Sequence, residues 1–188
     1  EQKDDWSFRR SKWFDAIKKE CQNVKENVGL LDMTAFAKCR IKGPKSEEFL
    51  DYLVANKIPK KIGRINLCHA LNTKGGVHSE FTIMKEAENS YYLVSAGANL
   101  RLDHDWIQKW MPNDGSVIFE DLTNSTGVLV VAGPKARELM QKVSTDDFSN
   151  ENFKWLTAKN VNVGYAPVNA MRVNFVGELG WELHHPIE

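Results

Sequence analysis

The sequence AMRVNFVGELGWEL, residues 170–183, decides how this chain is expected to fold. Apolar and polar residues alternate from Met171 to Phe175 and again from Trp181 to Leu183, and a period of two is typical of half-buried strands. Gly177 and Gly180 bracket the predicted turn, because glycine tolerates positive φ angles. The stretch therefore predicts two strands, the second of which carries Glu182 between two apolar residues.

Glu182 has two interpretations at this stage. On the pattern alone it is a solvent-facing residue of an antiparallel edge strand. Alternatively, it is a carboxylate on a rigid strand that accepts two parallel hydrogen bonds from a flat amino-heterocycle.

Residues 177–182, GELGWE, resemble the Gly-Glu-x-Gly-Trp/Phe-Glu signature of the folate-dependent aminomethyltransferases, the family of the glycine-cleavage T-protein. The resemblance implies that Glu182 holds the pterin ring of tetrahydrofolate. It also implies an α+β fold of antiparallel sheets with helices on one face, built as two similar α/β halves. Family members continue well beyond the last residue here, so we expect the chain to be a truncated portion of that fold, cut from something longer.

Composition excludes several classes of partner. The chain has 188 residues with 25 basic and 25 acidic side chains, so no positive field favours nucleic acid or an anionic membrane. No apolar run approaches the length of a membrane-spanning helix. The cysteines are odd in number and far apart, which fits reduced thiols in an intracellular compartment, either bacterial cytoplasm or mitochondrial matrix.

Periodicity divides the chain into three predicted parts. Residues 1–37 form an N-terminal helix and entry segment, because apolar positions recur at helical spacing from Ser11 to Glu26. Residues 38–115 form the first α+β half and 116–188 the second, incomplete half. Each half contains a strand that leads into Gly-Pro and then a helix, which predicts that the two halves have similar folds.

The stretch LNTKGGVHSEF, residues 71–81, predicts a hairpin whose second strand carries Glu80. It resembles the family block Leu-Asn-x-x-Gly-Gly-x-x-x-Asp-Leu, in which Glu80 takes the place of the Asp near folate N5 and N10. The resemblance implies that Glu80 is the catalytic carboxylate, which stabilises a cation and relays a proton as 5,10-methylenetetrahydrofolate forms. Glu is one methylene longer than Asp, which changes where the charge lies. From the pattern alone, Glu80 is an exposed strand residue.

Four further residues fall where the family lines its folate channel: Phe36, Leu67, Ser95 and Phe175. Three of them are apolar, which implies a hydrophobic slot with fewer polar contacts than the T-protein pattern provides. Phe175 and Trp181 are also interpreted as core residues, the more common place for an aromatic side chain.

Two other kinds of site are considered. Histidine lies close to acidic residues or to a second histidine at His78–Glu80, Asp103–Asp105 and His184–His185, but none has the spacing of a known metal site, so no metal is predicted. The basic residues between Asn56 and Arg64 are either solvated or a contact for the glutamate tail of a folate.

Residues 7–14, SFRRSKWF, resemble the entry found where this domain follows the amine-oxidising flavoprotein domain of dimethylglycine and sarcosine dehydrogenases. The resemblance implies that an N-terminal flavin domain of the parent protein oxidises an N-methyl amine with FAD. This segment, which lacks a Gly-x-Gly-x-x-Gly fingerprint, would collect the amine-derived one-carbon unit without binding FAD. Two alternatives are a non-catalytic adaptor with the same fold and a folate-dependent demethylase without flavin.

Overall fold

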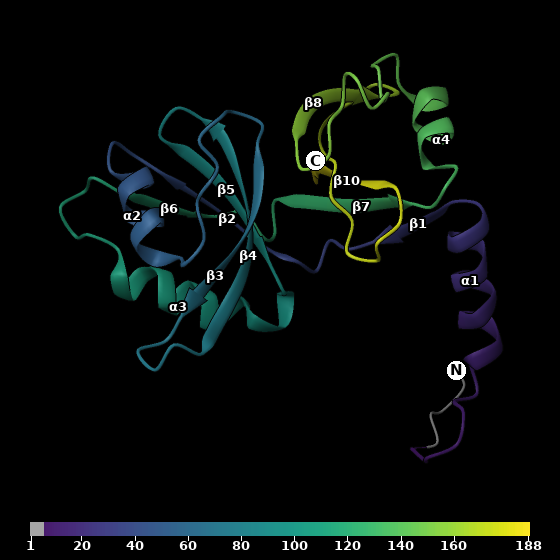
Figure 1. The fold of residues 1–188 in the computed structure, drawn as a ribbon, viewed down its shortest axis with the longest axis horizontal. Coiled ribbons are helices and arrows are strands. Elements are labelled where there is room, and N and C mark those ends of the chain that lie inside the picture. The colour runs from purple at the N-terminus through teal and green to yellow at the C-terminus, as the bar shows by residue number, and fades with distance from the viewer. Residues whose placement is uncertain (1–5) are drawn as a thin grey trace.

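The computed structural model describes residues 6–188, which contain two five-stranded antiparallel sheets (Figure 1). Sheet A has the order β1 (Gly29–Asp32), β7 (Thr126–Ala132), β10 (Gly180–Pro186), β9 (Ala166–Met171) and β8 (Ala158–Val163). Sheet B has the order β3 (Ile65–Leu71), β4 (Val77–Ala87), β5 (Ser90–Ser95), β2 (Ala37–Lys42) and β6 (Ile118–Asp121). The helical elements are α1 (Phe14–Glu26), α2 (Ser46–Leu53), η1 (Gly97–Asn99), α3 (Leu100–Trp110) and α4 (Ala136–Val143).

Helices cover one face of each sheet. On sheet B, Leu50 of α2 and Ile107 of α3 pack into a core with the buried side chains of β2, β4 and β5. On sheet A, Met140 of α4 packs into a second core that contains Trp181. Trp181 is fully buried, so its interpretation as a core residue is confirmed. The predicted α+β class with antiparallel sheets is confirmed as well.

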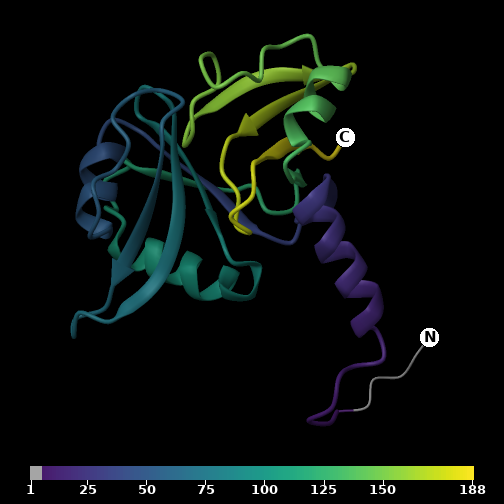
Figure 2. The ribbon, with the colours of Figure 1, turned by 45° about the vertical axis from the view of Figure 1, so that its right-hand side comes forward.

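The uncovered faces of the two sheets meet each other. Tyr92 and Met84 of sheet B pack against Met171 of sheet A in a third buried cluster. Helix α1 lies apart from these layers and points away from the body of the molecule (Figure 2). None of its residues is buried. The sheets, and not the first helix, therefore position any site between the halves.

The strand–Gly-Pro–helix unit occurs twice, as predicted. Gly43 links β2 to α2 with φ 121°, and Gly133 links β7 to α4 with φ 133°. A Cβ atom at Gly43 would lie 2.4 Å from the carbonyl oxygen of Ser116, and one at Gly133 would lie 2.4 Å from that of Asn27. Both glycines are therefore required by the backbone angle and by a neighbouring backbone that comes close.

Two strands pair across the predicted boundaries. Strand β1, from the segment predicted as an entry, pairs with β7 in sheet A. Strand β6, which follows the predicted boundary at residue 115, pairs with β2 in sheet B. Local sequence patterns do not report such long-range pairing, which is why the boundaries in space differ from those in sequence.

The structure corrects the interpretation of residues 170–176. Strand β9 ends at Met171, and residues 172–179 form a connection instead of a strand. Within this connection the Val173 amide donates to the Met171 carbonyl, and Asn174 Oδ1 accepts the Val176 amide at 2.8 Å. An Asn side chain that binds its own backbone competes with strand pairing, so the alternation of residues was misleading here.

Another local prediction is confirmed. Residues 72–76 form the turn between β3 and β4, with Gly75 at φ 79°. The three cysteines, Cys21, Cys39 and Cys68, form no disulfide bond. Within residues 6–188 we find no helix with the length and apolar character needed to cross a membrane.

We expect Gly133→Ala to lower the free energy of unfolding by about 2 kcal/mol or more, because the new methyl group meets a backbone oxygen at a positive φ angle. Gly75→Ala is the matched control. Its φ is also positive, but nothing lies within 4 Å of the new Cβ, so it should cost only about 1 kcal/mol. Urea denaturation measures both values, and equal losses would contradict the close-approach argument.

Candidate functional site

Glu182 lies in the middle of sheet A. Strand β10 is the central strand, where Glu182 faces Val130 of β7 on one side and Met171 of β9 on the other. The residue is only 7% exposed. The interpretation of Glu182 as a solvent-facing edge residue is therefore wrong, because both edges of its strand are hydrogen-bonded and its carboxylate is buried.

A cavity of about 50 Å³ lies beside this carboxylate. Phe36, Phe175 and Glu182, which were predicted from separate parts of the sequence, all line it. The cavity is completed by residues from β1, the segment just after it, β7 and the 172–179 connection: Leu31, Met33, Val130, Ala132, Asn174 and Val176. Phe175 is 86% exposed, so it forms part of the wall without being a core residue, and its core interpretation is wrong.

Two of the residues that line the cavity carry polar groups with unused hydrogen-bonding capacity. Asn174 Nδ2 is buried and has no hydrogen-bond partner among the residues that the structure describes. Glu182 accepts one hydrogen bond, from His184 Nε2 to Oε2 at 3.1 Å. A heterocycle edge with N–H donors beside a carbonyl group would satisfy both side chains. Sequence analysis missed Asn174, which carries no motif of its own.

Glu80 and Leu67 lie elsewhere, on the face of sheet B that is turned towards sheet A. Strand alternation places Glu80 on the same face as Met84, and its partner across β3 is His69. Glu80 Oε2 lies 2.8 Å from His69 Nε2, and the Glu80 side chain is 53% exposed. Leu67 is 46% exposed. Neither residue lines the cavity beside Glu182.

Ser95 lies on the opposite, helix-covered face of sheet B. It pairs with Ala37 in β2, and its Oγ donates to Asp103 Oδ2 of α3 at 2.6 Å. Asp103 is 2% exposed and accepts a second hydrogen bond from Ser79. In the structure Ser95 therefore satisfies a buried carboxylate between sheet and helix.

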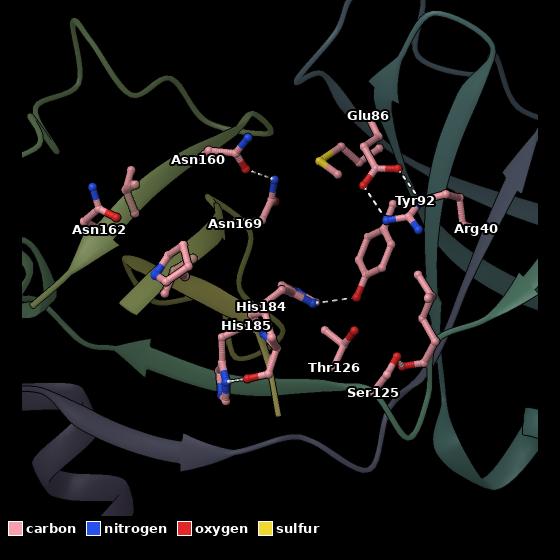
Figure 3. Close-up of a pocket in the computed structure, with 16 residues that line it drawn as sticks. Arg40, Glu86, Tyr92, Ser125, Thr126, Asn160, Asn162, Asn169, His184 and His185 are labelled. Atoms are coloured by element: carbon pink, nitrogen blue, oxygen red, sulfur yellow. Dashed lines mark hydrogen bonds and ion pairs between the residues drawn. The ribbon is translucent and has the colours of Figure 1, made fainter. Parts of the chain in front are cut away.

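A larger cavity, of about 410 Å³, opens between the two sheets (Figure 3). Arg40 on its wall forms a two-point ion pair with Glu86, at 2.5 and 2.7 Å, so the charge is neutralised. Tyr92 and His184 lie 3.0 Å apart across it. None of the predicted site residues lines this cavity. Sequence reasoning could have found His184, because a residue two positions after Glu182 in a strand lies on the same face of the sheet.

Burial raises the pKa of the Tyr92 phenol, and the negative charge of Glu182 raises it further. Tyr92 is therefore a neutral O–H group at physiological pH. In the part of the chain that the structure describes, no three His, Cys, Asp or Glu side chains come together as a metal site. His184, considered above as a ligand candidate, is instead bound to Tyr92 and Glu182.

Comparison with known proteins identifies the family. Residues 3–188 match the family model of the GCVT N-terminal domain. The chain belongs to this family. The GCVT N-terminal domain here is 39% identical over 180 residues to mouse dimethylglycine dehydrogenase, mitochondrial, covering 95% of this chain and 21% of that protein. It is 30% identical over 185 residues to the mouse mitochondrial pyruvate dehydrogenase phosphatase regulatory subunit, covering 97% and 21%.

A solved structure has the same fold. Aminomethyltransferase T of the glycine cleavage system from Bartonella henselae matches this GCVT N-terminal domain with a TM-score of 0.77 and 22% identity, over 90% of this chain and 45% of that one. The dehydrogenase and the regulatory subunit are much longer, and the domain spans about a fifth of each.

We expect Ser95→Ala to lower the free energy of unfolding by about 1.5–3 kcal/mol, because the buried Asp103 carboxylate loses a donor. Ser125→Ala is the control, since its exposed hydroxyl binds only the Leu122 carbonyl and should change stability by less than about 0.5 kcal/mol. Chemical denaturation measures both. An unchanged stability of Ser95→Ala would argue that the hydroxyl serves a ligand and not Asp103.

Proposed function

We propose that this domain binds tetrahydrofolate and that Glu182 holds the pterin ring. The observation that carries the proposal is the buried carboxylate on the central strand of sheet A, beside a cavity that is also lined by Asn174, whose amide nitrogen is unpaired among the described residues. The amino and ring N–H groups of a pterin match the carboxylate, and the pterin carbonyl matches the amide. Membership of the GCVT N-terminal domain family supports the same ligand.

Binding requires the cavity to widen. Pockets for molecules of this size usually enclose about 300 Å³ or more, whereas the cavity beside Glu182 encloses about 50 Å³. One of its walls is the 172–179 connection, which contributes Phe175 and Val176, both of them exposed residues. Moving this connection outwards would admit a bicyclic ring while Glu182, held by two neighbouring strands, stays in place.

The reaction proposed for the site is the capture of a one-carbon unit. Tetrahydrofolate, when bound, supplies two nitrogens that accept the unit. Glu80, the catalytic carboxylate of the proposal, would stabilise positive charge and take up a proton at Oε2, where His69 already lies within hydrogen-bond distance. Phe36, Leu67 and Phe175 would supply apolar surface to the folate, while Ser95 would act through Asp103 and the packing of α3.

The parent protein is proposed to be an FAD-dependent dehydrogenase of N-methyl amines such as dimethylglycine or sarcosine, with this domain as the acceptor of the one-carbon unit. The similarity to mouse dimethylglycine dehydrogenase supports this proposal. We place the protein in the mitochondrial matrix or the bacterial cytoplasm, where folate chemistry and free thiols are compatible.

The 188-residue chain alone should show no dehydrogenase activity, because its sequence has no dinucleotide-binding fingerprint to hold FAD. The measurement is the reduction of an artificial electron acceptor with dimethylglycine or sarcosine as substrate and FAD added. Amine-dependent reduction by the isolated chain would overturn the division of labour proposed here.

A non-catalytic adaptor is the second candidate function. Two observations favour it: the half-exposed position of Glu80, outside the cavity of Glu182, and the similarity to a relative named as a regulatory subunit. An adaptor needs the fold and its surfaces but no folate, so ligand binding separates the two functions.

We expect Glu182→Gln to weaken tetrahydrofolate binding by about tenfold or more, because a neutral amide replaces the charged acceptor. Isothermal titration calorimetry measures the dissociation constant. Glu178→Gln is the matched control, since Glu178 lies four residues away in the same motif and does not line the cavity. If the unmodified protein binds no folate, the adaptor function holds. Equal affinity of Glu182→Gln and the unmodified protein would remove Glu182 from the site.

A further inference from the structure

His184 joins the two sheets through a pair of hydrogen bonds. It is 4% exposed and lies on β10 two residues after Glu182, so both side chains share one face of sheet A. His184 Nε2 lies 3.1 Å from Glu182 Oε2. His184 Nδ1 lies 3.0 Å from Tyr92 Oη, a contact drawn in Figure 3. Tyr92 belongs to β5 of sheet B, so the chain of contacts crosses from one half to the other.

The hydrogen bonds among Glu182, His184 and Tyr92 determine which ring nitrogen of His184 carries a hydrogen. An ionised carboxylate can only accept, so His184 Nε2 must carry a hydrogen and donate it to Glu182. The Tyr92 phenol then donates to the bare Nδ1 nitrogen. A doubly protonated ring would leave the phenol hydrogen without an acceptor among the described residues, whereas the neutral Nε2–H tautomer pairs every group.

His184 is also the hydrogen-bond partner that residues 6–188 provide for the Glu182 carboxylate. A buried carboxylate without a fixed partner is costly and can rotate away from a ligand. With Oε2 held by the imidazole, Oε1 and the remaining lone pair of Oε2 stay available to the 50 Å³ cavity.

We propose that His184 is the positioning residue for Glu182: as a neutral imidazole held by Tyr92, it fixes the carboxylate in the orientation that receives the heterocycle. This inference rests on the proposed function for the identity of the ligand. It assigns a role to His184 and Tyr92 that acts through Glu182, without contact between either residue and the folate.

The first test needs no ligand. In the natural protein labelled with ¹⁵N-histidine, the His184 signal, assigned by its loss in His184→Gln, should show one protonated and one bare ring nitrogen. Tyr92→Phe and Glu182→Gln should each change this spectrum. A doubly protonated ring, an Nδ1–H tautomer, or a spectrum unchanged in both variants would overturn the proposal.

The second test is a double-mutant cycle on tetrahydrofolate binding to the same protein. His184→Leu should weaken binding about tenfold, and the conservative His184→Gln, which keeps a donor near the position of Nε2, should restore most of it. In a Glu182→Gln background, His184→Leu should add little further loss, because the carboxylate through which it acts is gone. Additive losses, or no rescue by Gln, would overturn the positioning role.

His185→Leu is the control variant, because it removes the histidine next to His184. His185 packs against Gly127 and makes no hydrogen bond to Glu182, so the dissociation constant should stay unchanged. Should His184→Leu fail to fold, Tyr92→Phe in the same cycle decides the outcome. Absence of folate binding by the unmodified protein would overturn the proposed function, and the histidine spectrum would still decide whether His184 holds Glu182.

Discussion

The structure depends on one buried carboxylate in the centre of a sheet. Moving a charge out of water is costly unless the charge is hydrogen-bonded, and Glu182 has His184 for this purpose. Strand β10 is paired on both sides, so Glu182 cannot shift without breaking backbone hydrogen bonds to β7 or β9. A site that must hold a ligand edge to within a fraction of an ångström is best placed on such an element.

The same constraint explains why the two halves form one unit. Tyr92 on sheet B completes the hydrogen bonds of His184 on sheet A, and the cluster around Met171 packs the uncovered faces together. Strand β6 of the second half joins the sheet of the first, and β1 of the predicted entry segment joins the sheet of the second. The environment of Glu182 is therefore a property of the interface between the halves, and neither half provides it alone.

The sequence predicted what local pattern controls and failed where distant segments decide. The turn at residues 72–76 and the two Gly-Pro units follow from backbone angles that glycine permits, so they could be found by inspection. The position of β10 at the centre of its sheet could not, because a period of two is the same for edge and central strands. Nor could alternation reveal that Asn174 binds its own backbone and ends the strand early. For Ser95, a family position indicated a ligand, whereas the packing of α3 against sheet B brings Asp103 to its hydroxyl.

The residues proposed for binding and those proposed for chemistry lie on different parts of this fold. Glu182, His184 and Tyr92 are buried and contribute to the packing of both sheets, so their loss would disturb the fold as well as any ligand. Glu80 is half exposed and bound only to His69, so its replacement would cost little stability. A chain with this fold can therefore lose the carboxylate proposed as catalytic and keep both its fold and the cavity beside Glu182. Similarity of fold, even at a TM-score of 0.77, then argues for a shared scaffold and does not by itself specify a reaction.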